Sequence, residues 1–154
     1  MSKLFEKEFI SHCNNQELEI NPNQIAVIKK LEQYYQSNFK SFFSKLFSKQ
    51  NSKKGFYLFG GVGVGKTMIL NFFIDQIDQK KLRQHFNEFM LSFHDFAHER
   101  KEKKEENIIN QFVKNLKSKA SLIYFDEFQV TNIVDAMILG KLFEQIFKEN
   151  IKII

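Results

Sequence analysis

The chain has 154 residues, of which 43% are hydrophobic and 27% charged, and this balance excludes a wholly disordered chain. The formal net charge of +5 permits weak attraction to nucleic acid or anionic lipid, but 21 lysines against two arginines are also typical of AT-rich codon usage, so we expect no specific nucleic-acid partner. The single cysteine, Cys13, excludes an internal disulfide and favours a reducing compartment, which we expect to be the cytoplasm.

Two helices are predicted in the first third of the chain. The first begins after Asn21, which can cap it, with Pro22 at the first helical position and Gln24 completing a capping box. Its apolar residues at helical spacing are Ile25, Ile28, Leu31 and Tyr35. A second helix over residues 39–47 carries a phenylalanine stripe flanked by lysines up to residue 54. We expect this stripe to face a core, and the alternative is peripheral contact with a membrane surface.

From residue 55 onward, short apolar strands alternate with amphipathic helices. Strands are predicted at residues 56–59, 83–89, 122–125 and 151–154. Helices are predicted at residues 66–79, 91–100 and 108–117, and a further helix is capped by Thr131, with Ala136, Leu139, Phe143 and Ile146 facing inward. The alternation predicts an α/β fold in which helices cover both faces of a parallel sheet.

A phosphate-loop pattern, G-x-x-x-x-G-K-[ST], lies between a predicted strand and a predicted helix. Glycines allow successive backbone N–H groups to surround phosphate oxygens, and the following helix directs its N-terminus at the same anion. Lys66 would reach the β- and γ-phosphates, and Thr67 would offer its hydroxyl to Mg²⁺. The alternative is a glycine-rich turn with an incidental lysine. The predicted nucleotide-binding residues are Gly60, Gly61, Val62, Gly63, Val64, Gly65, Lys66 and Thr67.

A pair of acids, Asp126 and Glu127, follows the apolar strand at residues 122–125. Ligands of open parallel sheets bind at the carboxyl ends of the strands, so Asp126 is predicted to hold Mg²⁺ beside the phosphate loop. Glu127 is placed to accept a proton from an attacking water, so Lys66 and Glu127 are the predicted catalytic residues of an ATPase. The alternative is that the two acids only cap the next turn.

Two other polar clusters carry weaker signals. His94 and His98 have the i, i+4 spacing of a zinc protease helix, but Asp95 stands where that motif requires glutamate, so we expect packing or surface roles for both histidines. His12 and Cys13 are adjacent, but no third residue orients them as a nucleophile and base, so we expect no catalysis there.

Three segments in the same order resemble the ZapE family of cell-division ATPases and its mitochondrial relatives. They are the phosphate loop at residues 57–68, the segment 85–90 with His94 after it, and the extended acidic motif at residues 126–139. The NPNQ sequence at residues 21–24 is similar to a further short motif, in which the resemblance implies that a residue near Gln24 approaches the nucleotide base. Asn21, Asn87 and Asn132 depart from the family pattern.

The resemblance implies a P-loop NTPase (AAA+-like) core, with Mg²⁺ and ATP as ligands and a division protein of the FtsZ type as a partner. It divides the chain into a helical segment, 1–54, and an incomplete ATPase core, 55–154. The family's later strand, its polar sensor and its arginine finger have no counterpart, and Arg83 and Arg100 lie too early in the chain to replace that arginine. We therefore expect a C-terminally truncated core that self-associates or pairs with a missing C-terminal half.

Three functional interpretations stay open at this point. The first is a Mg²⁺-dependent ATPase of the ZapE type. The second is a non-catalytic fragment of a split or decaying gene that at most binds ATP, an interpretation favoured by the missing sensor and arginine finger. The third is a helicase loader with the same core, which salt-dependent binding of single-stranded DNA would separate from the first.

Overall fold

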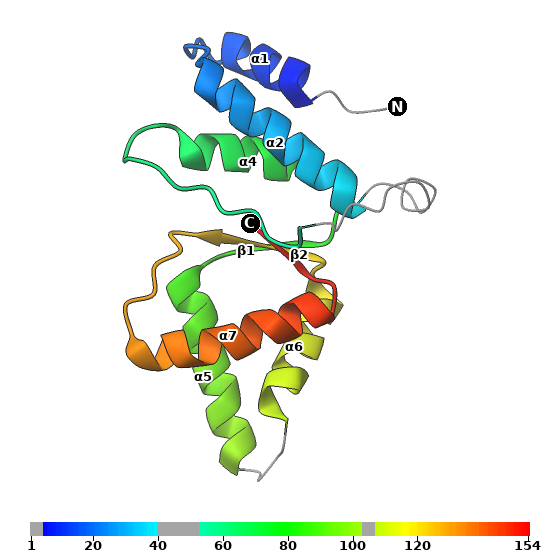
Figure 1. Ribbon diagram of the computed structural model, residues 1–154, viewed down its shortest axis with the longest axis vertical. Helices are drawn as coiled ribbons and strands as arrows, with labels where there is room; N and C mark the ends of the chain where they lie inside the picture. The colour runs from blue at the N-terminus through cyan, green and yellow to red at the C-terminus, as the bar shows by residue number, and fades with distance from the viewer. Residues whose placement is uncertain (1–4, 40–52, 103–106) are drawn as a thin grey trace. The chain divides into compact units, whose positions relative to one another are not determined.

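The computed structural model describes residues 5–39, 53–102 and 107–154 (Figure 1). The chain forms two compact units, Met1–Asp78 and Gln79–Ile154, within the described residues. The predicted division at residue 54 follows the change from helices to alternating elements, and it stays a prediction. All but Phe39 of the predicted helix at 39–47 lies outside the described residues.

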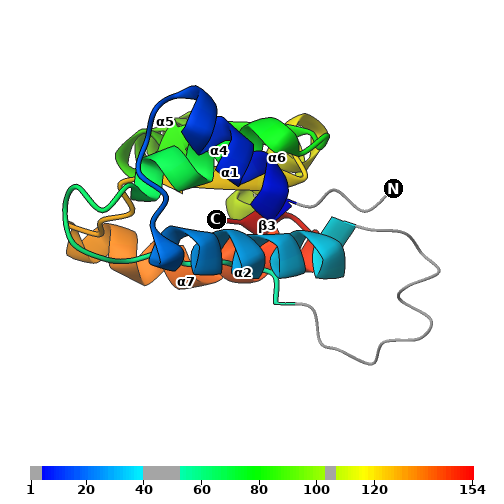
Figure 2. The same cartoon turned by 90° about the horizontal axis from the view of Figure 1, so that it is seen from above.

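In the part of the first unit that the structure describes, three helices form a cluster: α1 (Phe5–Asn15), α2 (Pro22–Phe39) and α4 (Lys66–Gln76). The three helices pack around one another (Figures 1 and 2). Aromatic rings fill the space between them: Phe9 meets Phe72 edge-on with ring centroids 5.0 Å apart, and Phe5 lies 5.5 Å from Phe73. The buried rings therefore fix α4, and with it the loop that precedes it, against α1 and α2.

The start of α2 confirms half of the predicted capping box. Asn21 Oδ1 accepts a hydrogen bond from the backbone N–H of Asn23 at 2.9 Å, as the N-cap role requires. The predicted second half is wrong, because the Gln24 side chain donates to the carbonyl oxygen of Val64 at 3.2 Å.

The second unit contains a parallel sheet of three strands, β1 (Lys81–His85), β2 (Leu122–Asp126) and β3 (Lys152–Ile153), in the order β1-β2-β3. Its helices are α5 (Phe86–Glu102), α6 (Ile108–Lys119) and α7 (Ile133–Lys148). Both crossovers step across the sheet in the same direction, so right-handed connections put all three helices on one face (Figure 1). The parallel α/β arrangement is confirmed, and helices on the second face stay a prediction.

A dense aromatic core joins β2 to the helices of this unit. Phe89 of α5 is fully buried, with its ring centroid 4.9 Å from Phe125 and 5.6 Å from Phe112. Phe86 meets Phe125 edge-on at 5.7 Å. These contacts hold the carboxyl end of β2 in place, and that end carries the acidic pair.

The predicted strand at residues 56–59 is wrong as a buried strand. These residues have no regular strand structure, and Tyr57 and Phe59 are 69% and 78% exposed. A strand exists only where its backbone pairs with a neighbour, and the sheet of β1, β2 and β3 does not include this segment. An apolar run alone does not say whether such a neighbour is present.

The predicted strand at residues 83–89 ends four residues too late. The structure has β1 up to His85 and α5 from Phe86, because apolar residues recur at helical spacing from that point. The buried set is Phe86, Phe89, Met90 and Phe93. Glu88 Oε2 also accepts from the backbone N–H of His85 at 3.4 Å, which is the reciprocal bond of a capping box.

The start of α7 differs from the prediction by one residue. The cap is Asn132 and not Thr131, since Asn132 Oδ1 accepts from the backbone N–H of Val134 at 2.8 Å. Of the predicted inward residues, Ile146 is fully buried and Leu139 and Phe143 are partly buried against the core, whereas Ala136 is exposed. The asparagine amide thus provides the acceptor oxygen that a capping acid would provide.

None of the helices in the described residues is both long enough and apolar enough to span a bilayer.

Replacing Phe89 by alanine is expected to lower the free energy of unfolding by about 3–5 kcal/mol, because it removes a buried ring and leaves a cavity. Leu91→Ala, on the same helix, is the control: Leu91 is 62% exposed, so its loss should change stability by no more than about 0.5 kcal/mol. Urea unfolding followed by circular dichroism measures both. Equal losses for the two variants would contradict the assignment of Phe89 to the core.

Candidate functional site

The loop from Gly60 to Gly65 reaches α4 through two residues with left-handed backbone conformations. Gly63 has φ 79° and Gly65 has φ 80°, values that side chains rarely tolerate. Gly65 is the N-cap of α4, and its carbonyl oxygen accepts the first helical bond from the N–H of Ile69 at 3.0 Å. The N–H groups of the first turn have no carbonyl within the helix to bond. The loop therefore offers backbone donors and a helix N-terminus to an anion.

Lys66 places its ammonium over this loop. Its Nζ donates to the carbonyl oxygens of Gly60 at 3.0 Å and Gly61 at 2.6 Å. These carbonyls hold the positive charge at the loop. Thr67 follows in the first turn of α4 and is exposed, so its hydroxyl is accessible.

Gln24 contacts this loop, whereas the sequence pattern alone predicted that it caps α2. Its Nε2 binds the Val64 carbonyl, and a Cβ at Gly65 would lie only 2.7 Å from the same nitrogen. Gln24 Oε1 is buried, and no donor among the described residues reaches it. The amide thus packs against the loop at the point where the loop enters α4. The family resemblance was the one signal that connected Gln24 to a nucleotide.

The acidic pair lies at the end of β2 in the second unit. Asp126 is the last residue of the strand, and Glu127 is exposed with a φ of 52°. A left-handed conformation is strained for a residue with a side chain, and such residues concentrate at functional sites. The turn at Glu127 places its carboxylate in solvent directly after the buried strand.

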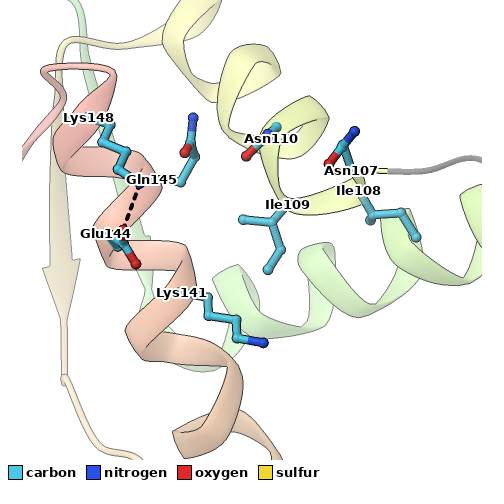
Figure 3. A pocket seen from close by; sticks show the side chains of 8 residues that line it. All are labelled: Asn107, Ile108, Ile109, Asn110, Lys141, Glu144, Gln145 and Lys148. Carbon is cyan, nitrogen blue, oxygen red and sulfur yellow. Dashed lines mark hydrogen bonds and ion pairs between the residues drawn. The ribbon is translucent and has the colours of Figure 1, made fainter.

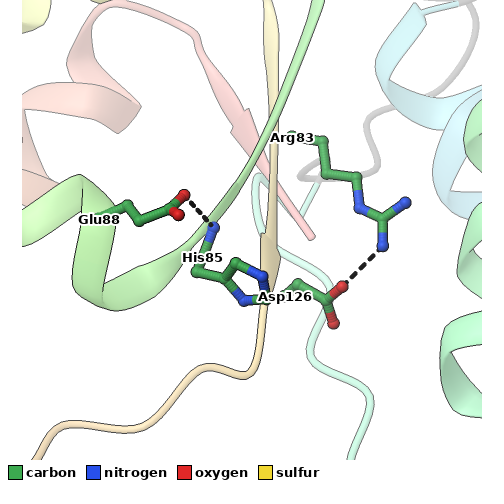
Figure 4. Close-up of polar contacts among 4 residues, drawn as sticks. All are labelled: Arg83, His85, Glu88 and Asp126. Atoms are coloured by element: carbon green, nitrogen blue, oxygen red, sulfur yellow. Dashed lines mark hydrogen bonds and ion pairs between the residues drawn. The ribbon is translucent and has the colours of Figure 1, made fainter.

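Asp126 forms an ion pair that the sequence did not predict. Its Oδ2 accepts from Arg83 Nη2 at 2.7 Å, from the neighbouring strand β1 (Figure 4). The same guanidinium lies 5.2 Å from the ring centroid of Tyr124. Burial raises the pKa of Tyr124, the Asp126 charge raises it further, and the Arg83 charge opposes the shift. Arg83 therefore interacts with both the Asp126 carboxylate and the Tyr124 ring at this end of β2.

The donor set of these residues fits magnesium. Mg²⁺ prefers oxygen ligands and is usually held by one or two carboxylates together with substrate phosphates. Asp126 provides a carboxylate that is already paired with a cation, Arg83, and Thr67 provides a hydroxyl. Within the described residues no three histidine, cysteine or acidic side chains come together as a metal cage. A magnesium ion would thus be held through the phosphates and a few oxygen atoms.

The predicted site residues fall into two groups. The predicted residues 60–67 lie in the first unit together with Gln24, and the predicted pair of Asp126 and Glu127 lies in the second together with Arg83, which was not predicted. That the two groups share one nucleotide stays a prediction.

The two histidine clusters have local partners. His94 Nε2 lies 2.6 Å from Asp135 Oδ1, a contact that joins α5 to the first turn of α7. Cys13 is fully buried and burial raises the pKa of its thiol, while His12 packs against the Phe72 ring at 5.3 Å. A buried thiol with a raised pKa is a poor nucleophile.

A pocket of about 480 Å³ lies between the start of α6 and α7 (Figure 3). Its polar lining includes Asn107, Lys141 and Lys148, and Lys148 is paired with Glu144 at 2.6 Å. None of the predicted site residues lines this pocket.

A family model described as AFG1-like ATPase matches residues 5–154. The chain belongs to the AFG1-like ATPase family. Among the relatives of this AFG1-like chain, Lactation elevated protein 1 homolog B of Danio rerio is 39% identical over 111 residues, covering 66% of the chain and 22% of the relative. Cell division protein ZapE of Escherichia coli K12 is 34% identical over 110 residues, covering 70% and 28%.

A third relative, the uncharacterized protein C115.02c of Schizosaccharomyces pombe, is 32% identical over 105 residues, covering 65% of the chain and 23% of the relative. The AFG1-like chain therefore spans about a quarter of the length of the curated relatives it matches. No solved structure matches it. The resemblance to ZapE-type ATPases is confirmed.

In this AFG1-like ATPase, Gly65→Ala is expected to destabilise the first unit, because a left-handed conformation costs about 1–2 kcal/mol for a residue with a Cβ, and that Cβ would collide with Gln24. Gly61→Ala is the control, since its Cβ would lie 4.0 Å from the nearest atom and its φ is not positive. Thermal unfolding of both variants measures the difference. A loss for Gly61→Ala as large as that for Gly65→Ala would contradict this account of the loop.

Proposed function

We propose that this chain is a Mg²⁺-dependent ATPase with a P-loop NTPase (AAA+-like) core. The nucleotide triphosphate binds at residues 60–67, Asp126 holds the magnesium ion with Thr67, and Glu127 is the general base. The observation that carries the proposal is the loop itself, in which left-handed Gly63 and Gly65 lead into the N-terminus of α4 with the Lys66 ammonium above them. Membership of an ATPase family supports the same chemistry.

The first unit provides the groups that bind the triphosphate. Backbone N–H groups of the loop and of the first turn of α4 donate to phosphate oxygens. Lys66 exchanges its two carbonyl partners, on Gly60 and Gly61, for the more negative β- and γ-phosphate oxygens. The ammonium therefore stays at the same place on the loop and exchanges weaker acceptors for stronger ones.

The second unit provides the groups that activate water. When bound, the magnesium ion neutralises charge that develops on the β- and γ-phosphates. Glu127 accepts the proton of the attacking water, a role that suits an exposed carboxylate one residue beyond Asp126. The Asp126 side chain is only 18% exposed whereas Glu127 is exposed, so one carboxylate can bind metal while the other faces the water.

The kinship with a cell division protein supports a narrower proposal on partners and location. The chain acts in the cytoplasm on a division protein of the FtsZ type, and its reduced Cys13 agrees with that compartment. A sedimentation assay with purified FtsZ polymers tests this proposal. A chain that pellets to the same extent with and without FtsZ polymers and ATP would contradict it.

Lys66→Ala is expected to abolish ATP binding, because it removes the only side-chain cation that bonds to the loop within the described residues. The cost of losing a charge-assisted contact is about 1.5–3 kcal/mol per bond, so affinity should fall at least tenfold. Isothermal titration calorimetry with MgATP measures the change. Lys30→Ala, an exposed lysine of α2, is the control and should bind as the wild type does. Retained wild-type affinity in Lys66→Ala would contradict the loop assignment.

Glu127→Gln is expected to retain MgATP binding and to lower turnover by about 10²–10⁴-fold, since the amide cannot accept the proton of water. Glu99→Gln, an exposed acid of α5, should leave turnover unchanged. Release of inorganic phosphate measures the rates. Unchanged turnover in Glu127→Gln would show that Glu127 is not the base. If the wild-type chain itself binds ATP but shows no turnover, the alternative of a chain that binds ATP without hydrolysing it would be favoured.

A further inference from the structure

Arg83 is held at the end of β2 by two separate contacts. Its Nη2 donates to Asp126 Oδ2 at 2.7 Å (Figure 4). Its guanidinium carbon also lies 5.2 Å from the Tyr124 ring centroid. Strand pairing fixes this geometry, because Arg83 is the register partner of Tyr124 in the parallel pair of β1 and β2. The arginine thus reaches the carboxylate from the adjacent strand.

The chemistry of this position requires a guanidinium. Lysine outnumbers arginine by 21 to two in this chain, so lysine is the expected residue wherever a positive charge alone is sufficient. Both arginines lie against rings: Arg83 on Tyr124, and Arg100 at 4.9 Å from the Phe96 ring centroid. A planar guanidinium can stack on a ring and donate to a carboxylate at once, whereas an ammonium is a strongly hydrated point charge. Arg83 makes both contacts, because its guanidinium lies on Tyr124 and pairs with the Asp126 carboxylate.

The ion pair occupies one of the two oxygens with which Asp126 could hold a metal. The Asp126 side chain is only 18% exposed, and one of its two oxygens is taken by Arg83. A divalent cation on the same carboxylate would stand next to the guanidinium, and two like charges at that separation repel strongly when little water lies between them. The two cations therefore compete for Asp126.

We propose that Arg83 is a tethered counter-ion that neutralises Asp126 in the metal-free chain and that Mg²⁺ must displace when the nucleotide is loaded. This inference rests on the proposed role of Asp126 as a metal ligand. Arg83 is a positioning residue in this account: it keeps the carboxylate paired and in place before loading, and it sets how strongly metal improves nucleotide binding.

The test is the ratio of two affinities in the full chain, for ADP with Mg²⁺ and for ADP with EDTA, each measured by calorimetry. In Arg83→Gln the metal has no competitor, so the ratio should rise about two- to fivefold above the wild-type ratio, the range expected for a partly exposed ion pair. Arg83→Lys keeps the charge without the stacking and should give a smaller rise. Arg100→Gln is the matched control and should leave the ratio unchanged.

The ratio separates this role from a merely structural one. A variant that only loosens the fold would lower both affinities together and leave the ratio as it is, which would overturn the inference. An unchanged or lower ratio in both Arg83→Gln and Arg83→Lys would do the same while the ATP-binding proposal stood. A wild-type chain that binds ADP in neither condition would overturn the proposed function and this inference together.

Discussion

The left-handed turn at Gly65 is the constraint on which the rest of this site depends. It brings the loop to the N-terminus of α4, so that the N–H groups of the first helical turn stay available to an anion. A side chain at Gly65 would be strained by the positive φ, and its Cβ would lie 2.7 Å from the Gln24 amide nitrogen and displace that amide. Helix α2 therefore supports the loop, and the aromatic contacts of Phe5 and Phe9 keep α4 in place behind it.

The second unit presents two acids at the end of a buried strand. Residues 122–125 are buried among phenylalanine rings, so the backbone of β2 is fixed up to Asp126. A carboxylate at the edge of such a core needs a counter-charge, and Arg83 supplies it from the neighbouring strand. The left-handed residue that follows, Glu127, directs the next carboxylate into solvent.

Local patterns predicted much of this arrangement. The glycine spacing predicted the loop, and helical spacing of apolar residues predicted α2 and most of α5. Two predictions were wrong because the outcome depends on a distant partner. The run at residues 56–59 is apolar but lies outside the sheet that the structure describes, and Gln24 fits a capping box but bonds to Val64, 40 residues away.

The acidic pair shows the same limit. Asp126 and Glu127 were predicted from their place after an apolar strand, whereas Arg83 was considered only as a substitute for an arginine finger and set aside. Its contact with Asp126 spans 43 residues and depends on the parallel register of β1 and β2. Strand register between separate segments is a tertiary property, and no local pattern near Arg83 predicted its contact with Asp126.

Thermal unfolding of the chain with and without MgATP tests the central claim most directly. If the loop binds nucleotide in the folded state, ATP at 100 times its dissociation constant should add about 2.7 kcal/mol to the free energy of unfolding. The midpoint of a cooperative transition should then rise by about 5–11 °C for a chain of this length. A midpoint that stays the same at saturating MgATP would contradict the claim that this chain holds a phosphate loop able to bind ATP.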